Sequence, residues 1–273
     1  MKKLLLMAML TVGMTAVAQQ RIDLWPQGAP HSNGDAQDTA YVMVFKSPLS
    51  AEGRGTPCVV ILPGGGYSHL AIGHEGTEWA PVLNGWGFSV VVVKYRMPHG
   101  VTEVPIEDAT EAVRLVRRHA AEWNIDPQRV GIMGSSAGGH LASTIATHAA
   151  AADRPDFQVL FYPVISMDKA VTHRWSHDYL LGADATLQLE EKYSNEKQVT
   201  ADTPPAFIVL STDDHVVQPR NGVNYYLALQ AHNVPAVLHV YATGDHGWGI
   251  RPSFRHHAEM LMELKGWIGT FLL

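Results

Sequence analysis

The sequence predicts one α/β domain with a mostly parallel central sheet and helices on both of its faces. Apolar, β-branched runs alternate along the chain with segments of helical periodicity, and this alternation favours parallel strands. Polar and apolar residues do not alternate within these runs, which is typical of strands covered on both faces. A chain of 273 residues, 46% hydrophobic and 17% charged, suits a single large domain with a sizeable core.

The expected strands are the apolar runs, and the expected helices follow them. The strands are 41–45, 58–62, 88–95, 130–133, 157–162, 206–210 and 236–241. The helices are 76–84, 105–123, 137–150, 219–231 and 254–271. The segment before the first strand is rich in Pro, Gly, Asn and Asp, so we expect it to be extended.

The helix at 105–123 has the clearest signals. Pro105 fits a first helical turn, and Glu107 and Asp108 complement the positive end of the helix dipole. The pattern therefore predicts an amphipathic helix with one face on the sheet. Its apolar residues at helical spacing are Ala109, Val113, Val116 and Ala120.

Residues 166–203 interrupt the strand–helix alternation. This segment is polar and has a short helical pattern near 187–193. Ligands of parallel α/β sheets bind at the carboxyl ends of the strands. We expect the segment to be a small insertion over that end, within a single domain that spans 19–273.

Residues 1–18 have the features of a secretory signal peptide. Lys2 and Lys3 form a charged start, residues 4–17 are apolar, and Ala16 to Ala18 give an A-x-A cleavage pattern. A membrane anchor is the alternative, but the apolar run is shorter than the ~20 residues needed to span a bilayer. We therefore expect an exported protein, periplasmic or secreted, with no membrane span in the mature chain.

Composition excludes several functions. The formal charge is −6 and no basic run is longer than Arg117-Arg118, so nucleic acid is not an expected partner. The single cysteine, Cys58, lies within the apolar run 57–62 and not at a turn, so we expect it to be neither a partner in an internal disulfide nor a nucleophile. His173 and His177 lack further ligands and a metalloprotease motif. We expect no metal and no cofactor.

A nucleophile motif follows the strand at 130–133. Gly134-Ser-Ser-Ala-Gly138 matches G-x-S-x-G, and a helix is expected directly after it. This strand–turn–helix context is what a nucleophile elbow requires, with Ser136 exposed above the sheet. A glycine-rich helix cap is the alternative interpretation. The context favours Ser136 as a catalytic nucleophile.

A glycine-rich loop follows the strand at 58–62. In Pro63-Gly-Gly-Gly-Tyr67, the absence of side chains leaves backbone amides open to a ligand. We expect the amide of Gly65 or Gly66, paired with that of Ala137, to form an oxyanion hole, in which one donor is typically worth ~10²–10³ in turnover. A flexible turn is the alternative. A phosphate-binding loop is disfavoured because no G-K-[ST] follows.

The general base and its partner follow later strands. His246 lies between glycines after the strand at 236–241, and Asp213-Asp214 follow the strand at 206–210. The order Ser, Asp, His matches the α/β-hydrolase order of catalytic residues. One carboxylate would orient the imidazole and stabilise its cation, and we favour Asp213, with Asp214 bracing the loop.

Three further side chains lie near these loops in the sequence. Tyr67 and His69 follow the glycines, and Trp248 follows His246. Each is a candidate for lining a substrate pocket, although aromatic residues in loops are as often packing residues.

These motifs together resemble the compact bacterial α/β-hydrolase esterases associated with acetyl xylan esterase activity. The shared features are residues 62–67, Asp126-Pro127, residues 134–141, Asp213-Asp214 and Gly247-Trp248. The resemblance implies a nucleophile at Ser136, a base at His246 and an acid at Asp213. Pro63 stands where hormone-sensitive-lipase-like enzymes have His, and the Asp-Asp-x-Val-Val pattern is similar to prolyl oligopeptidase catalytic domains.

The resemblance implies a serine carboxylesterase that removes acetyl groups from a plant polysaccharide such as xylan, or from a small ester. A feruloyl or broad aryl and alkyl esterase uses the same machinery and is the second hypothesis. A small serine peptidase is the third, and a binding module that has lost catalysis is the last. Pocket size, amide hydrolysis and labelling by a serine-directed phosphonate would separate these hypotheses.

Overall fold

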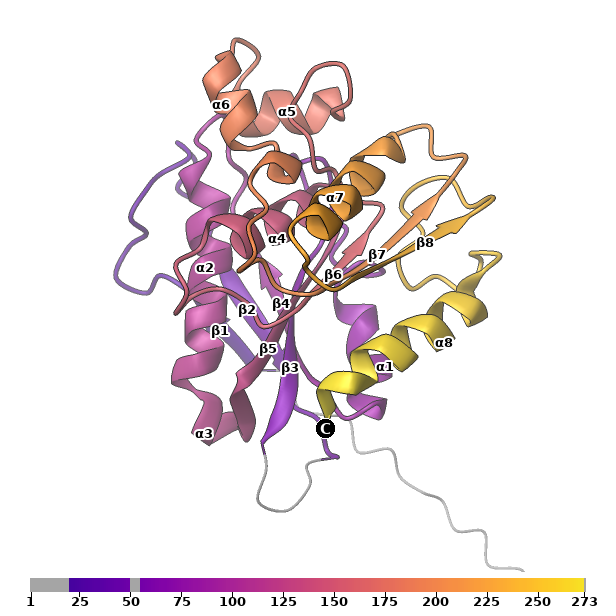
Figure 1. Ribbon diagram of the computed structural model, residues 1–273. Helices are drawn as coiled ribbons and strands as arrows, with labels where there is room; N and C mark the ends of the chain where they lie inside the picture. The colour runs from indigo at the N-terminus through magenta and orange to yellow at the C-terminus, as the bar shows by residue number, and fades with distance from the viewer. Residues whose placement is uncertain (1–19, 50–54, 273) are drawn as a thin grey trace, which may run out of the picture.

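In the computed structural model, which describes residues 20–49 and 55–272, these residues form an eight-stranded sheet with helices on both faces (Figure 1). The expected signal peptide at 1–18 lies outside the described residues. No helix within the described ranges is long and apolar enough to cross a membrane.

The strands run in the order β1-β2-β4-β3-β5-β6-β7-β8 across the sheet. The first two pairings, β1 with β2 and β2 with β4, are antiparallel, and all the later ones are parallel. The expected mostly parallel sheet is therefore confirmed. The strands are β1 (Gln20–Asp23), β2 (Tyr41–Phe45), β3 (Thr56–Leu62), β4 (Ser89–Lys94), β5 (Ile125–Ser135), β6 (Gln158–Phe161), β7 (Ala206–Ser211) and β8 (Ala236–Tyr241).

The expected helices all form, with differences at their ends. The long helix expected at 105–123 is divided into α2 and α3, because the backbone of His119 leaves helical geometry between them. The α-helices are α1 (Ala80–Gly85), α2 (Glu103–Arg118), α3 (Ala120–Trp123), α4 (Ser136–His148), α5 (Arg174–Leu181), α6 (Leu187–Lys192), α7 (Arg220–Ala231) and α8 (His257–Ile268). Short 3₁₀ helices occupy Thr77–Trp79, Asn195–Lys197 and Gly269–Leu272.

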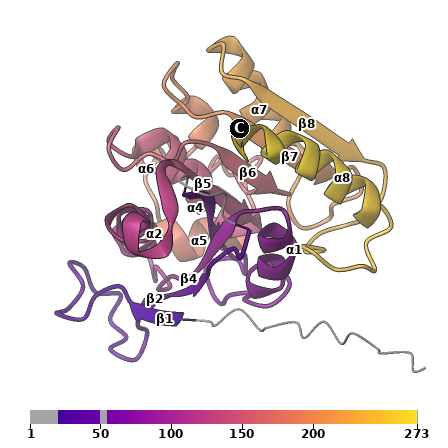
Figure 2. The same ribbon diagram turned by 90° about the horizontal axis from the view of Figure 1, so that it is seen from below.

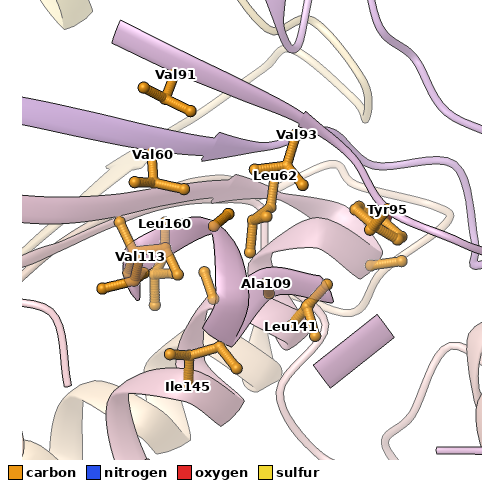
Figure 3. Close-up of a cluster of buried hydrophobic side chains, with 14 of the residues drawn as sticks. Val60, Leu62, Val91, Val93, Tyr95, Ala109, Val113, Leu141, Ile145 and Leu160 are labelled. Carbon is orange, nitrogen blue, oxygen red and sulfur yellow. The ribbon is translucent and has the colours of Figure 1, made fainter. Parts of the chain in front are cut away.

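Alternate residues of the central strands enter two separate cores, one on each face of the sheet. In β3, Val60 and Leu62 lie with residues of α2 and α4 (Figure 3) in a core that also includes residues of α7, whereas Val59 and Ile61 lie in a core with residues of α1 and α8. Figure 2 shows these two sets of helices on opposite sides of the sheet. Continuous apolar strands are therefore required, since each fully buried aliphatic side chain stabilises the fold by about 1.5–3 kcal/mol.

The segment 166–203 follows the carboxyl end of β6 and contains α5 and α6, which lie at the top of Figure 1, beyond the ends of the strands. The expected helix near 187–193 is α6, whereas α5 was not expected. Strand β1 was also not expected, because Gln20–Asp23 has a single apolar residue. The loops that follow β3, β5, β7 and β8 form the site described next.

Candidate active site

Ser136 lies at a sharp turn between β5 and α4. Its φ of 53° is in the left-handed region, which is strained for a residue with a side chain. A Cβ on Gly134 would lie 2.1 Å from the carbonyl oxygen of Gly138, and a Cβ on Gly138 would lie 2.1 Å from that of Leu62. The chain can therefore turn this sharply only with glycine at both positions, and Ser136 lies where a nucleophile elbow places its serine.

His246 connects Ser136 to a carboxylate. Its Nε2 is 2.8 Å from Ser136 Oγ, and its Nδ1 is 2.7 Å from Asp214 Oδ2. An ionised carboxylate only accepts hydrogen bonds, so Nδ1 carries the proton. In the neutral imidazole, Nε2 then accepts the Ser136 hydroxyl proton. This geometry lets His246 remove that proton as the oxygen attacks a substrate.

The carboxylate at His246 belongs to Asp214, so the prediction of Asp213 is wrong. Asp214 Oδ1 accepts from the amides of Val216 and Val217 at 2.9 and 2.8 Å, which turns its Oδ2 toward the imidazole. Asp213 Oδ1 instead accepts from the Asp245 amide at 2.8 Å, and this bond lowers the pKa of Asp213. Asp213 braces the loop, the role that the sequence analysis gave to Asp214.

Burial strengthens the interaction between His246 and Asp214. The side chain of Asp214 is 2% exposed and that of His246 is 13% exposed, so water screens the pair little. The ring of Tyr162 packs edge-on against the imidazole, with 4.6 Å between ring centroids. Burial lowers the pKa of the neighbouring His173, and electrostatic repulsion from His246 lowers it further.

Gly65 and Gly66 lie beside Ser136 at the wall of one pocket. Their φ angles are 134° and 64°, and a Cβ on Gly65 would lie 2.1 Å from the carbonyl oxygen of His69, so the turn requires glycine there. Neither amide donates a hydrogen bond to a described residue. Ala137 is the second residue of α4, where the amide has no acceptor within the helix. All three expected oxyanion donors are therefore available.

A buried carboxylate that the sequence analysis missed holds this glycine loop. Glu75 is 3% exposed, and its Oε2 accepts from the Gly64 amide at 2.9 Å. Its Oε1 accepts from the Tyr162 hydroxyl at 2.7 Å, and that hydroxyl accepts from the Gly249 amide at 2.7 Å. Burial, and then Glu75, raise the pKa of Tyr162 well above its usual value, so the phenol stays protonated. Glu75 and Tyr162 thus connect the glycine loop to the loop of His246.

Tyr67 does not line the pocket, contrary to expectation. It is fully buried, and its hydroxyl is 2.9 Å from His140 Nδ1, while His140 Nε2 is 2.8 Å from the carbonyl oxygen of Tyr193. A carbonyl only accepts, so Nε2 carries the proton and Nδ1 accepts from Tyr67. Burial lowers the pKa of His140 to about 4. Tyr67 therefore anchors the glycine loop to α4 and to the insertion.

Trp248 is also a packing residue and not a pocket residue. It is buried against Phe254, with parallel rings 4.0 Å apart, and its Nε1 donates to Ser211 Oγ at 3.1 Å. The sequence shows that Trp248 lies close to His246 along the chain, but it does not show in which direction the indole points. Of the three candidates for lining the pocket, only His69 does so.

The pocket above Ser136 has a volume of about 590 Å³ and is open to solvent. Two exposed apolar side chains at its edge were missed by the sequence analysis: Trp175 of α5, which is 55% exposed, and Val216, which is 46% exposed. Trp175 lies in the polar insertion, whose sequence has no periodicity that would identify Trp175 as a pocket residue. Its position shows that the insertion contributes to the pocket wall.

Comparisons with known proteins agree with this geometry. A family model described as an alpha/beta hydrolase fold matches residues 59–250. An acetylxylan esterase of Xylanibacter ruminicola is 42% identical over 83% of this chain and 47% of its own length, and an endo-1,4-beta-xylanase B of Butyrivibrio fibrisolvens is 35% identical over 70% and 32%. The chain thus spans less than half the length of either relative.

Solved structures extend the comparison to nearly the whole chain. The crystal structure of an acetyl ester-xyloside bifunctional hydrolase from Caldicellulosiruptor lactoaceticus superposes with a TM-score of 0.83 and 32% identity, covering 92% of this chain and 96% of that one. A carboxylesterase of Lactobacillus plantarum, at 20% identity and a TM-score of 0.76, shares the fold. The fold, the turn at the nucleophile and these matches show that the chain belongs to the α/β-hydrolase family.

Proposed function

We propose that this protein is a serine carboxylesterase that removes acetyl groups from xylan. The observation that carries the proposal is the continuous line of hydrogen bonds from Ser136 through His246 to Asp214, beside a loop in which the amides of Gly65 and Gly66 donate to no described residue. The substrate is suggested by relatives named as an acetylxylan esterase and an acetyl ester-xyloside hydrolase.

Acylation begins when Ser136 Oγ attacks the ester carbonyl carbon and its proton moves to His246 Nε2. The carbonyl oxygen becomes an oxyanion, which accepts from the amides of Ala137 and of Gly65 or Gly66. Asp214 stabilises the imidazolium through Nδ1. The C–O bond to the sugar then breaks, the sugar oxygen takes the proton from Nε2, and acetyl-Ser136 remains.

Deacylation repeats these steps with water as the nucleophile. Nε2 removes a proton from the water as its oxygen attacks the acetyl carbon, and the same amides hold the second oxyanion. Collapse releases acetate and returns the proton to Ser136 Oγ. Apart from the substrate and the attacking water, every group in this cycle is a side chain or amide of the protein.

Acetate release from native acetylated xylan, measured with the wild type and Ser136→Ala, tests the proposal. We expect the variant to lose on the order of 10⁴-fold or more of the turnover while its circular dichroism spectrum stays unchanged. Equal turnover in the two proteins would reject the mechanism. Ferulate release without acetate release would move the substrate to feruloyl esters, and cleavage of simple acetates alone would reject xylan.

Export is the remaining part of the proposal. Lys2, Lys3 and the apolar run up to the A-x-A pattern at Ala18 support a cleaved signal peptide. Export would bring the enzyme to a polymer that cannot enter the cell. Cell fractionation and N-terminal sequencing test this, because a cytoplasmic protein that retains Met1 would contradict it.

A further inference from the structure

Trp175 is an exposed indole at the edge of the pocket that holds Ser136. One face of its ring stacks on Tyr179, with centroids 5.3 Å apart and planes 28° apart, so the indole has a supported orientation. A Cβ on Gly66 would lie 2.8 Å from Trp175 Cδ1, which places the indole directly against the glycine loop. More than half of the side chain remains open to solvent. Because Trp175 lines the pocket that contains Ser136, this exposed indole is placed to contact a ligand bound there.

The reaction geometry determines which part of an ester can reach this surface. The carbonyl carbon must lie at Ser136 Oγ and its oxygen at the amides of Ala137 and of Gly65 or Gly66, so the acetyl group lies beside Ser136. The alcohol part leaves first and must therefore point toward the opening. Trp175 on α5 and Val216, which follows Asp214, are the exposed apolar side chains of the opening.

Polar side chains beside this apolar surface fit a hydroxylated ligand. His69 and Arg251 line the same pocket and are exposed, and Arg251 Nη2 donates to His74 Nδ1 at 3.2 Å. A pyranose combines an apolar C–H face with hydroxyl groups around its edge. An indole face with hydrogen-bond donors nearby therefore complements a sugar ring better than it complements an alkyl chain.

We propose that Trp175 forms a subsite that stacks on the pyranose ring whose acetyl group is removed. This inference rests on the proposed function and gives the insertion a role in substrate selection. Trp175 contacts the alcohol part of the ester and takes no part in bond breaking. The acetyl group itself does not touch it.

Kinetics of Trp175→Ala on two acetate esters test the subsite. The first substrate is an acetylated xylooligosaccharide, and the second is ethyl acetate, whose alcohol is too small to reach the indole. We expect KM for the oligosaccharide to rise about tenfold, as for the loss of a stacking contact, and kcat/KM for ethyl acetate to change less than twofold. Trp175→Phe should recover part of the lost affinity. Leu187→Ala, which removes an apolar side chain 80% exposed on α6, is the matched control and should change neither.

Each other outcome overturns the subsite in a distinguishable way. An unchanged KM for the oligosaccharide in Trp175→Ala rejects the subsite and leaves the proposed function standing. Equal losses on both esters mean that Trp175 only supports the glycine loop. If the wild type cleaves ethyl acetate but not the oligosaccharide, both the proposed substrate and the sugar subsite are rejected.

Discussion

The two ends of the pocket are built differently. Its floor, which we define as Ser136, Gly64 to Gly66, Glu75, Tyr162 and His246, is mostly buried, and its polar side chains are hydrogen-bonded to one another or to the glycine loop. Its rim, defined as His69, Trp175 and Val216, is exposed. The floor must hold groups in place before charge develops, because preorganised dipoles need no rearrangement during the reaction. Under the proposed function, the rim meets the alcohol part of the ester and then releases it.

This contrast means that substitutions in the floor should lower turnover on every ester, whereas those in the rim should alter the choice of ester. The hydrogen bonds within the floor also explain why the floor tolerates a buried carboxylate. Glu75 accepts hydrogen bonds on both oxygens, from the Gly64 amide and the Tyr162 hydroxyl, which offsets part of its desolvation cost.

The adjacent aspartates give the largest expected difference. Asp214→Asn should lower kcat by about 10³–10⁴-fold, since a neutral amide cannot stabilise the imidazolium and can favour the wrong tautomer. Asp213→Asn should change kcat by less than about threefold, because the amide oxygen can still accept from the Asp245 amide. Steady-state kinetics on ethyl acetate compare the two variants. A larger loss in Asp213→Asn would contradict the assignment.

Removal of the charge of Glu75 tests the rigidity of the floor. In Glu75→Gln, one amide oxygen must replace two carboxylate oxygens, so either the Gly64 amide or the Tyr162 hydroxyl loses its acceptor. We expect kcat to fall about 10–100-fold with KM nearly unchanged, the usual loss when a supporting residue is altered. The measurement is the rate at which a phosphonate phosphonylates Ser136, together with kcat and KM.

Two further variants show whether Glu75 acts through position. Tyr162→Phe keeps the ring against His246 but removes the hydroxyl, so it should reproduce part of the loss. Glu78→Gln, at an exposed carboxylate three positions along the chain, is the control and should have wild-type kinetics. If Glu75→Gln lowered only the melting temperature and left kcat intact, its role would be structural alone.

Ser136 and His246 could be predicted because each follows a strand whose apolar pattern is unmistakable. The choice between Asp213 and Asp214 could not, since neighbouring residues in a turn point in different directions, and the backbone path through Val216 and Val217 decides which one faces the imidazole. Tyr67 and Trp248 were misassigned for the same reason. Glu75 and Trp175 are single residues outside any motif, and only tertiary contacts bring them to the site.

A smaller expected effect concerns the pH dependence of stability at His140. This residue has no catalytic role and anchors the floor through its hydrogen bond to Tyr67. Burial lowers its pKa from 6.5 to about 4, so below pH 6.5 the unfolded chain binds a proton that the folded chain does not. The contribution of His140 to stability is therefore complete above pH 6.5 and declines as the pH falls toward 4. Between pH 7.5 and 5.5 the loss should be about 1 kcal/mol.

Urea unfolding of the wild type and His140→Gln at these two pH values measures this loss. The variant is expected to be less stable at both values, but its free energy of unfolding should fall by about 1 kcal/mol less between them. Other titrating groups are present in both proteins and cancel in the difference. Equal falls would mean that His140 becomes protonated in the folded protein at pH 5.5, as it does in the unfolded chain. Its bond to Tyr67 would then reverse, with Nδ1 donating to the hydroxyl, and the anchor would hold the floor through a charged imidazole.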